Sequence, residues 1–139
     1  IGNGSEDDQY LPVQVSGIRT AVAISAGDSH TVILTDDGTV WAFGNNADYQ
    51  LGTSSVIYSD IPIAVSGVSG IKAVGAGNAH NLAVKTDGTE WAWGANGYYQ
   101  LGDGTTTKRF TPASLTGPAD IISTDAGGRS RASQARSSG

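Results

Sequence analysis

The amino-acid sequence repeats at an interval of fifty residues, and this repeat constrains the fold more than any other feature. No insertion or deletion separates the copies, so a chance similarity is not credible. A fixed period of this length is the signature of a chain built from stacked supersecondary units. The positions that recur are Trp41 and Trp91, His30 and His80, Gly44 and Gly94, Tyr49-Gln50-Leu51-Gly52 and Tyr99-Gln100-Leu101-Gly102, and Pro12, Pro62 and Pro112.

Each period contains four short segments that are typical of β-strands. They are apolar and β-branched, and the 20 glycines of the chain indicate many tight turns. Asp37-Gly38 is a two-residue hairpin signal, because glycine tolerates a positive φ angle. Four antiparallel strands in a period near fifty predict an all-β chain of β-propeller blades. We expect strands over 11–15, 21–26, 30–35 and 39–44, and again fifty residues later over 61–65, 71–76, 80–85 and 89–94.

Two tryptophans stand at the same strand position in the two units. Trp41 and Trp91 are separated by one full period. An aromatic side chain at a strictly repeated strand position is typical of the packing core of a blade. We therefore expect both indoles to be largely buried in equivalent places.

One ordered series of motifs runs through both units. The series reads Ala26-Gly27-Asp28-Ser29-His30, Asp37-Gly38-Thr39-Val40-Trp41-Ala42-Phe43-Gly44, Asn46 and Gln50-Leu51-Gly52, and then Ala76-Gly77-Asn78-Ala79-His80, Asp87-Gly88-Thr89-Glu90-Trp91-Ala92-Trp93-Gly94, Asn96 and Gln100-Leu101-Gly102. This series resembles the repeat of the regulator-of-chromosome-condensation family over about residues 1 to 128. The family usually has glycine just before Gln-Leu-Gly, whereas this chain has Tyr49 and Tyr99 there, which suggests a subgroup feature or a modified loop.

The repeat divides the chain into two complete units with a partial unit on each side. The resemblance implies a propeller that closes with about seven blades, so we expect an incomplete propeller in one chain. The Ser-rich tail shows no repeat and is typical of a flexible linker. The expected ranges are 1–15 for a partial blade, 16–65 and 66–115 for the complete blade repeats, 116–128 for a second partial blade and 129–139 for the tail.

Two interpretations account for an incomplete ring of blades. The chain is a piece of a longer protein, or it is a short protomer that assembles with other copies of itself. In the second case, residues 1–15 of one copy would join residues 113–128 of the next and cover the unpaired sheet edges. We expect a symmetric homo-oligomer, with three copies preferred.

Composition limits the partners and the chemistry. The formal net charge is −5, whereas nucleic-acid binders usually carry a basic patch, so we expect no nucleic-acid partner. No run of about 18 apolar residues is present, so we expect no membrane span. Cysteine is absent, which excludes disulfides and thiolate metal sites. We expect no cofactor and no metal, and we prefer a secreted or cell-surface bacterial location.

Six residues are candidates for binding. The histidines follow an Ala-Gly turn, and the resemblance implies that they define the repeat by hydrogen-bonding the blade turn; we favour this structural role over metal binding or acid–base chemistry. The two tyrosines share a loop rich in Gly and Asn, where a flat apolar ring with a polar tip suits sugar or protein contact, although loop filler is an equally good interpretation. The candidates are Asp28, His30, Asn78, His80, Tyr98 and Tyr99.

The sequence singles out no catalytic residue. Asp36, Asp37 and Asp87 fall at hairpin turns, where Asp is expected for backbone hydrogen bonding. Glu90 is unusual because its repeat mate is Val40, but a glycosidase needs two carboxylates about 5 to 10 Å apart and no pair stands out. We expect a non-catalytic binding or protein-interaction module. The alternatives are a carbohydrate-active hydrolase or lectin that uses carboxylates and aromatics around an oligomeric propeller channel, and a structural repeat of a bacterial surface protein.

Overall fold

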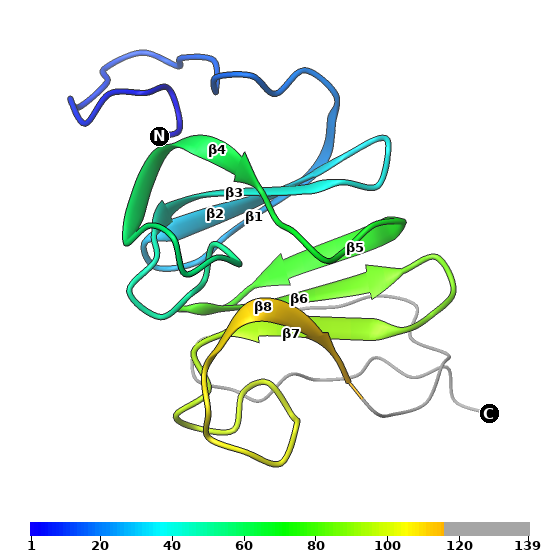
Figure 1. Ribbon diagram of the computed structural model, residues 1–139. Coiled ribbons are helices and arrows are strands. Elements are labelled where there is room, and N and C mark those ends of the chain that lie inside the picture. The colour runs from blue at the N-terminus through cyan, green and yellow to red at the C-terminus, as the bar shows by residue number, and fades with distance from the viewer. Residues whose placement is uncertain (116–139) are drawn as a thin grey trace.

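The computed structural model describes residues 1–115 and contains two four-stranded antiparallel sheets. Each sheet is a meander, because strands that follow one another in sequence are also hydrogen-bonded neighbours (Figure 1). This architecture confirms the expected all-β fold with two blades of an open propeller. The strands are β1 (Ala21–Ala26), β2 (His30–Thr35), β3 (Val40–Asn45) and β4 (Tyr58–Ala64) in the first sheet, and β5 (Ile71–Ala76), β6 (His80–Lys85), β7 (Glu90–Gly94) and β8 (Arg109–Ser114) in the second.

The Asp-Gly turns form the hairpins that the sequence predicts. Gly38 has a φ angle of +81°, in the left-handed region that favours glycine. The Asp37 carboxylate accepts hydrogen bonds from Thr35 Oγ1 at 2.7 Å and from the Thr39 N–H at 3.0 Å. These bonds close the turn, and the expected strands on either side of it are confirmed with shifts of at most one residue.

The strand expected over 11–15 is wrong, because this segment is irregular in the structure. The outermost strand of a blade needs the third strand as its partner, as β4 pairs with β3. Among residues 1–115, no strand pairs with the segment 11–15. The sheets lie within the expected ranges 16–65 and 66–115, whereas 116–128 and 129–139 lie outside the described residues.

The main core lies between the two blades. Val32 and Leu34 of β2 point to the second blade, because successive side chains of a strand alternate between the two faces of its sheet. They pack with Ala83 and Trp93, which come from the facing side of the second sheet. Burying an apolar side chain of this size contributes about 1.5–3 kcal/mol, so this interface holds the two blades together.

The expectation that Trp41 and Trp91 are largely buried is wrong, because both are only half-buried. They lie at equivalent places beside the Asp-Gly hairpin, where the core ends at the edge of the blade. Trp91 Nε1 donates to Thr89 Oγ1 at 3.2 Å in that turn. The fully buried indole is that of Trp93, two residues further along the same face of the strand, where its repeat mate is Phe43.

The repeat extends upstream of the first sheet. The backbone of Gly2 lies against the ring of Phe43, so a Cβ atom at this position would be 2.9 Å from Phe43 Cζ. Gly52 occupies the corresponding place near Trp93, where a Cβ atom would lie 3.5 Å from the indole nitrogen. Gly2 and Gly52, which are fifty residues apart, therefore occupy equivalent places in the structure. Within residues 1–115 no helix is long and apolar enough to cross a membrane.

Candidate functional site

The turn after β1 and the long loop after β3 emerge at the same end of the first blade, because β1 and β3 run in the same direction. The Asn45 N–H joins them by donating to the Ser29 carbonyl at 2.7 Å. The second blade repeats the bond between the Ala95 N–H and the Ala79 carbonyl at 2.8 Å. This end, which we call the loop end, carries all six candidate residues.

Asp28 and Asn78 meet at the seam between the blades. The Asp28 N–H donates to the Asn78 carbonyl at 3.1 Å, and both residues are exposed. Tyr98 and Tyr99 are also exposed, in the loop of the second blade. Four of the six candidates therefore lie on the accessible surface of the loop end.

The two histidines lie inside the protein. His30 is buried, and its Nε2 atom is 2.7 Å from Asn81 Oδ1 of the next blade. The ring covers the backbone of Gly27, where a Cβ atom would clash with His30 Cε1. His80 is fully buried over Gly77 in the same way. These contacts support the structural interpretation of both histidines, and a direct binding role for them stays a prediction.

Burial keeps both imidazoles neutral. Desolvation lowers the pKa of His30, although its bond to Asn81 and the nearby Asp28 charge oppose this effect. Desolvation, followed by the proximity of His30, lowers the pKa of His80 to about 4. A neutral imidazole fits an apolar seam between blades, whereas a charged one does not.

Two asparagines that sequence reasoning did not select fix the loops. Asn46 Oδ1 accepts from the Leu51 N–H at 2.8 Å, and its Nδ2 donates to the carbonyls of Thr53 and Val56. Asn96 is fully buried in the second blade, where its Oδ1 accepts from the Leu101 N–H at 3.0 Å and its Nδ2 donates to the carbonyls of Thr105 and Thr107. Their recurrence at a fifty-residue interval within a loop was the available signal for this role.

Tyr49 and Tyr99 hold the left-handed backbone conformation that a glycine normally provides. Their φ angles are 65° and 60°, and no other non-glycine residue among those described has a positive φ. An L-residue in this region costs roughly 1–2 kcal/mol, which the surrounding loop must offset. The doubled replacement of glycine has therefore kept the turn and added an aromatic side chain to each loop.

Tyr49 connects the loop of the first blade to the second blade. Its ring packs edge-on against Phe110 with centroids 5.8 Å apart, and Lys108 Nζ lies 4.9 Å from its centroid. The same ammonium donates to the Ala47 carbonyl at 3.2 Å and lies 3.5 Å from Asp48 Oδ1. The loop end is thus a continuous surface across the two blades, with aromatic rings held in fixed positions.

The carboxylates with shifted pKa values serve as turn acceptors. Hydrogen bonds from Thr35 and Thr39 lower the pKa of Asp37, and bonds from Thr89 lower that of Asp87. Burial alone would raise the pKa of Asp103, but hydrogen bonds from Thr105, Arg109 and Asn96 hold it at about 2. Such groups stay ionised, so they do not suit the protonated acid that a glycosidase requires.

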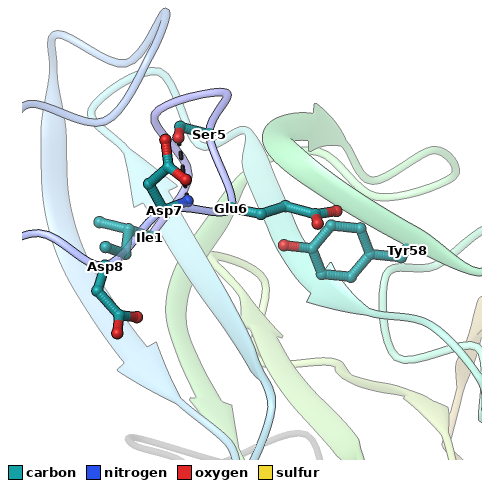
Figure 2. Close-up of a pocket in the computed structure, with 6 residues that line it drawn as sticks. All are labelled: Ile1, Ser5, Glu6, Asp7, Asp8 and Tyr58. Atoms are coloured by element: carbon teal, nitrogen blue, oxygen red, sulfur yellow. Dashed lines mark hydrogen bonds between the residues drawn. The ribbon is translucent and has the colours of Figure 1, made fainter.

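A pocket of about 380 Å³ lies beside the irregular segment before the first blade (Figure 2). It is lined by Ile1, Ser5, Glu6, Asp7, Asp8 and Tyr58. Figure 2 shows that the Glu6 side chain extends toward Tyr58, whereas Asp8 lies on the other side of Ile1 and its side chain points downward in this view. The carboxylates do not converge, and residues 1–115 contain no group of three side chains able to hold a metal ion.

Comparison with known families gives matches along most of the chain. Two family models match, both described as the Regulator of chromosome condensation (RCC1) repeat. One covers residues 21–50 and 71–100, and the other covers residues 1–34, 37–84 and 87–130.

Characterised relatives and solved structures share parts of this arrangement. Human E3 ubiquitin-protein ligase HERC2 is 41% identical over 54 residues, which is 37% of this chain and 1% of that protein. The mouse inhibitor of Bruton tyrosine kinase is also 41% identical over 54 residues, which is 4% of its length. Prp20p of Saccharomyces cerevisiae, a protein with binding properties toward Gsp1p and histones, superposes with a TM-score of 0.73 and 24% identity over 84% of this chain. Human WBSCR16 superposes with a TM-score of 0.66 and 28% identity over 74% of this chain.

The chain covers only a part of each of these proteins. It spans 31% of the Prp20p chain and 27% of the WBSCR16 chain. The matched region includes both complete repeats and the segments around them. The chain belongs to the Regulator of chromosome condensation (RCC1) repeat family.

Proposed function

We propose that this chain is a non-catalytic protein-interaction module whose loop end contacts the partner. The observation that carries the proposal is the exposed tyrosine pair, Tyr98 and Tyr99, on a loop whose base is fixed by buried hydrogen bonds. A loop whose backbone is already held in place loses little conformational freedom on binding, and tyrosine is enriched in protein interfaces. Asp28 and Asn78 supply polar contacts on the same surface.

Relatives with the same fold support a protein as the class of partner. Prp20p has binding properties toward Gsp1p and histones, and a structure of Prp20 bound to Kap60 superposes on this chain with a TM-score of 0.71. We extend only the class of ligand to this chain, because a shared fold does not determine a partner.

The experiment compares partner capture by the wild-type chain and by a loop variant that carries Tyr98→Ala and Tyr99→Gly. Glycine is chosen at 99 because it accepts the positive φ of that position. Lys72→Ala, an exposed residue of β5 outside the loop end, is the matched control. We expect the loop variant, but not the control, to lose at least tenfold in affinity for the captured protein in calorimetry. Equal affinities for all three chains would refute the role of the loop end.

The glycoside hydrolase and lectin alternatives gain no support from the site. Hydrogen bonds within their turns lower the pKa of Asp37 and of Asp87, and at Asp103 burial is outweighed by hydrogen bonds from Thr105, Arg109 and Asn96 that lower its pKa. The aromatic residue Tyr49 packs on the neighbouring blade instead of lining a sugar-sized pocket. A protein partner therefore stays the preferred hypothesis.

We also propose that copies of this chain associate. Each blade buries a sheet face only against its neighbour, and two blades do not close a ring. The expected joint between residues 1–15 and 113–128 falls partly outside the described residues. Light scattering at micromolar concentration tests the proposal, and a well-folded monomer would refute it. The secreted or cell-surface bacterial location is likewise a proposal, which cell fractionation tests.

A further inference from the structure

The surroundings of the two half-buried tryptophans differ between the blades. In the second blade, Lys85 Nζ lies 4.3 Å from the centroid of the Trp91 ring. Fifty residues earlier the lysine is replaced by Thr35, whose side chain is shorter and uncharged. Within residues 1–115, no cation covers the ring of Trp41, although it occupies the same position of its blade as Trp91. The second blade therefore supplies its own ammonium group at a place where the first blade does not.

The place left open in the first blade is a pocket. Its volume is about 170 Å³. Thr35 and Trp41 lie on one face of the sheet, and the Asp37 carboxylate completes the polar side. The residues that line it are Gly17, Ile18, Arg19, Thr20, Thr35, Asp37 and Trp41.

The electrostatics of this pocket favour a cation. Hydrogen bonds from the turn lower the pKa of Asp37, so its carboxylate is ionised at neutral pH. In the second blade, hydrogen bonds from Thr89 have the largest effect in lowering the pKa of Asp87, and the charge of Lys85 adds a smaller effect in the same direction, as expected for an ammonium group that lies over the indole near the turn carboxylate. An indole face and a carboxylate together are a common arrangement for binding an ammonium group.

We propose that the pocket over Trp41 binds the ammonium group of a lysine side chain presented by a protein partner. The proposal rests on the proposed function, because it assigns the chain a second contact with a protein. The pocket lies beside the Asp-Gly hairpin, at the opposite end of the blade from the loop end, so a partner that uses both sites must reach along the blade. Lys85 over Trp91 is the internal template for the bound state.

Arg19 is the alternative cation from within the chain. It lines the pocket and is exposed, but its guanidinium has no ring contact with Trp41 and no ion pair with Asp37. The pocket is therefore not filled by the arginine of the chain itself. The Arg19→Ala variant distinguishes a pocket that Arg19 occupies from one that is open to a lysine of the partner.

The test uses the indole N–H signals of the full ¹⁵N-labelled chain, which has three tryptophans. The probe is the peptide acetyl-Ala-Lys-Ala-amide, and the matched peptide with norleucine in place of lysine is uncharged. Because one cation–π contact is weak, roughly 50 mM peptide is required. We expect the lysine peptide to shift the Trp41 signal, while Trp91 does not respond because Lys85 occupies its ring.

Two variants exchange the residue types at the equivalent positions 35 and 85, and each is expected to reverse the response of the tryptophan beside it. Thr35→Lys places an internal ammonium over Trp41 and abolishes its response, whereas Lys85→Thr makes Trp91 respond. Thr35 is buried, so Lys85→Thr decides the matter if Thr35→Lys does not fold. The proposal is overturned if the norleucine peptide shifts the Trp41 signal as much as the lysine peptide does, or if the Trp41 signal shifts only in the Arg19→Ala variant. It is also overturned if the Trp91 signal does not shift in the Lys85→Thr variant.

The outcome is separable from the proposed function. The protein captured by the loop end is titrated against the Asp37→Asn variant. This substitution removes the negative charge of the pocket and leaves the tyrosine loop unchanged. If the pocket contributes, affinity falls by about three- to tenfold, while the loop variant loses more. An unchanged affinity together with a silent Trp41 refutes this site and leaves the loop end as the contact surface.

Discussion

Lowering the pH is expected to destabilise the chain through His80. The imidazole is fully buried in the folded protein, and burial and the proximity of His30 lower its pKa from 6.5 to about 4. The unfolded chain therefore binds a proton at a pH where the folded chain does not. Its contribution to stability is complete above pH 6.5, decreases as the pH falls below that value, and is lost by about pH 4.

The size of this effect follows from the difference between the two pKa values. One pKa unit corresponds to about 1.4 kcal/mol, so His80 alone accounts for about 3 kcal/mol between neutral pH and pH 4. His30 acts in the same direction, because its pKa is also lowered by burial. Asp103 contributes little in this range, because its stabilising effect is lost only as the pH falls from the ordinary pKa of 3.8 toward about 2.

Urea unfolding followed by tryptophan fluorescence measures the effect at several pH values between about 7 and 4.5. The comparison chain is His80→Gln, which removes the titrating group and keeps a polar side chain of similar size. We expect the free energy of unfolding of the wild type to fall more steeply with decreasing pH than that of the variant. Parallel curves for the two chains would show that His80 is not the buried neutral group inferred from the structure.

Three further predictions concern the seam, the loop and the tail. Trp93→Phe removes the indole N–H bond to the Gln50 carbonyl, at 3.1 Å, and should cost about 1 kcal/mol in urea unfolding; a neutral result would show that this bond adds nothing. Asn96→Ala removes several buried hydrogen bonds, so we expect a loss of about 2–4 kcal/mol and faster amide exchange over 98–107, and unchanged exchange would contradict the anchoring role. Deleting 130–139, a segment outside the described residues, should leave the melting temperature nearly unchanged, and a large decrease would show that the tail is structural.

The strand pattern was predictable because it depends on local chemistry that recurs. The run His30–Thr35 is apolar and β-branched and is followed by Asp37-Gly38, so its strand bounds were correct. The strand over 11–15 failed because a strand also needs a partner, and no residue pattern within 11–15 reports whether one is present. Accessible loop residues such as Tyr98 were predictable from composition, but the role of Asn96 was not, since its bonds depend on the closed loop.

The sequence by itself determined the family, the blade repeat and the positions of the turns, because each unit carries its own complete pattern. Only the tertiary structure decided which partners the repeated residues meet. His30 bonds to Asn81, a residue fifty-one positions away that faces it only when two blades pack side by side. Likewise, the indole N–H of Trp93 donates to the Gln50 carbonyl of the first blade. Such contacts depend on the tertiary structure because a residue's environment comes from the neighbouring strands and blades, which a repeat pattern does not encode.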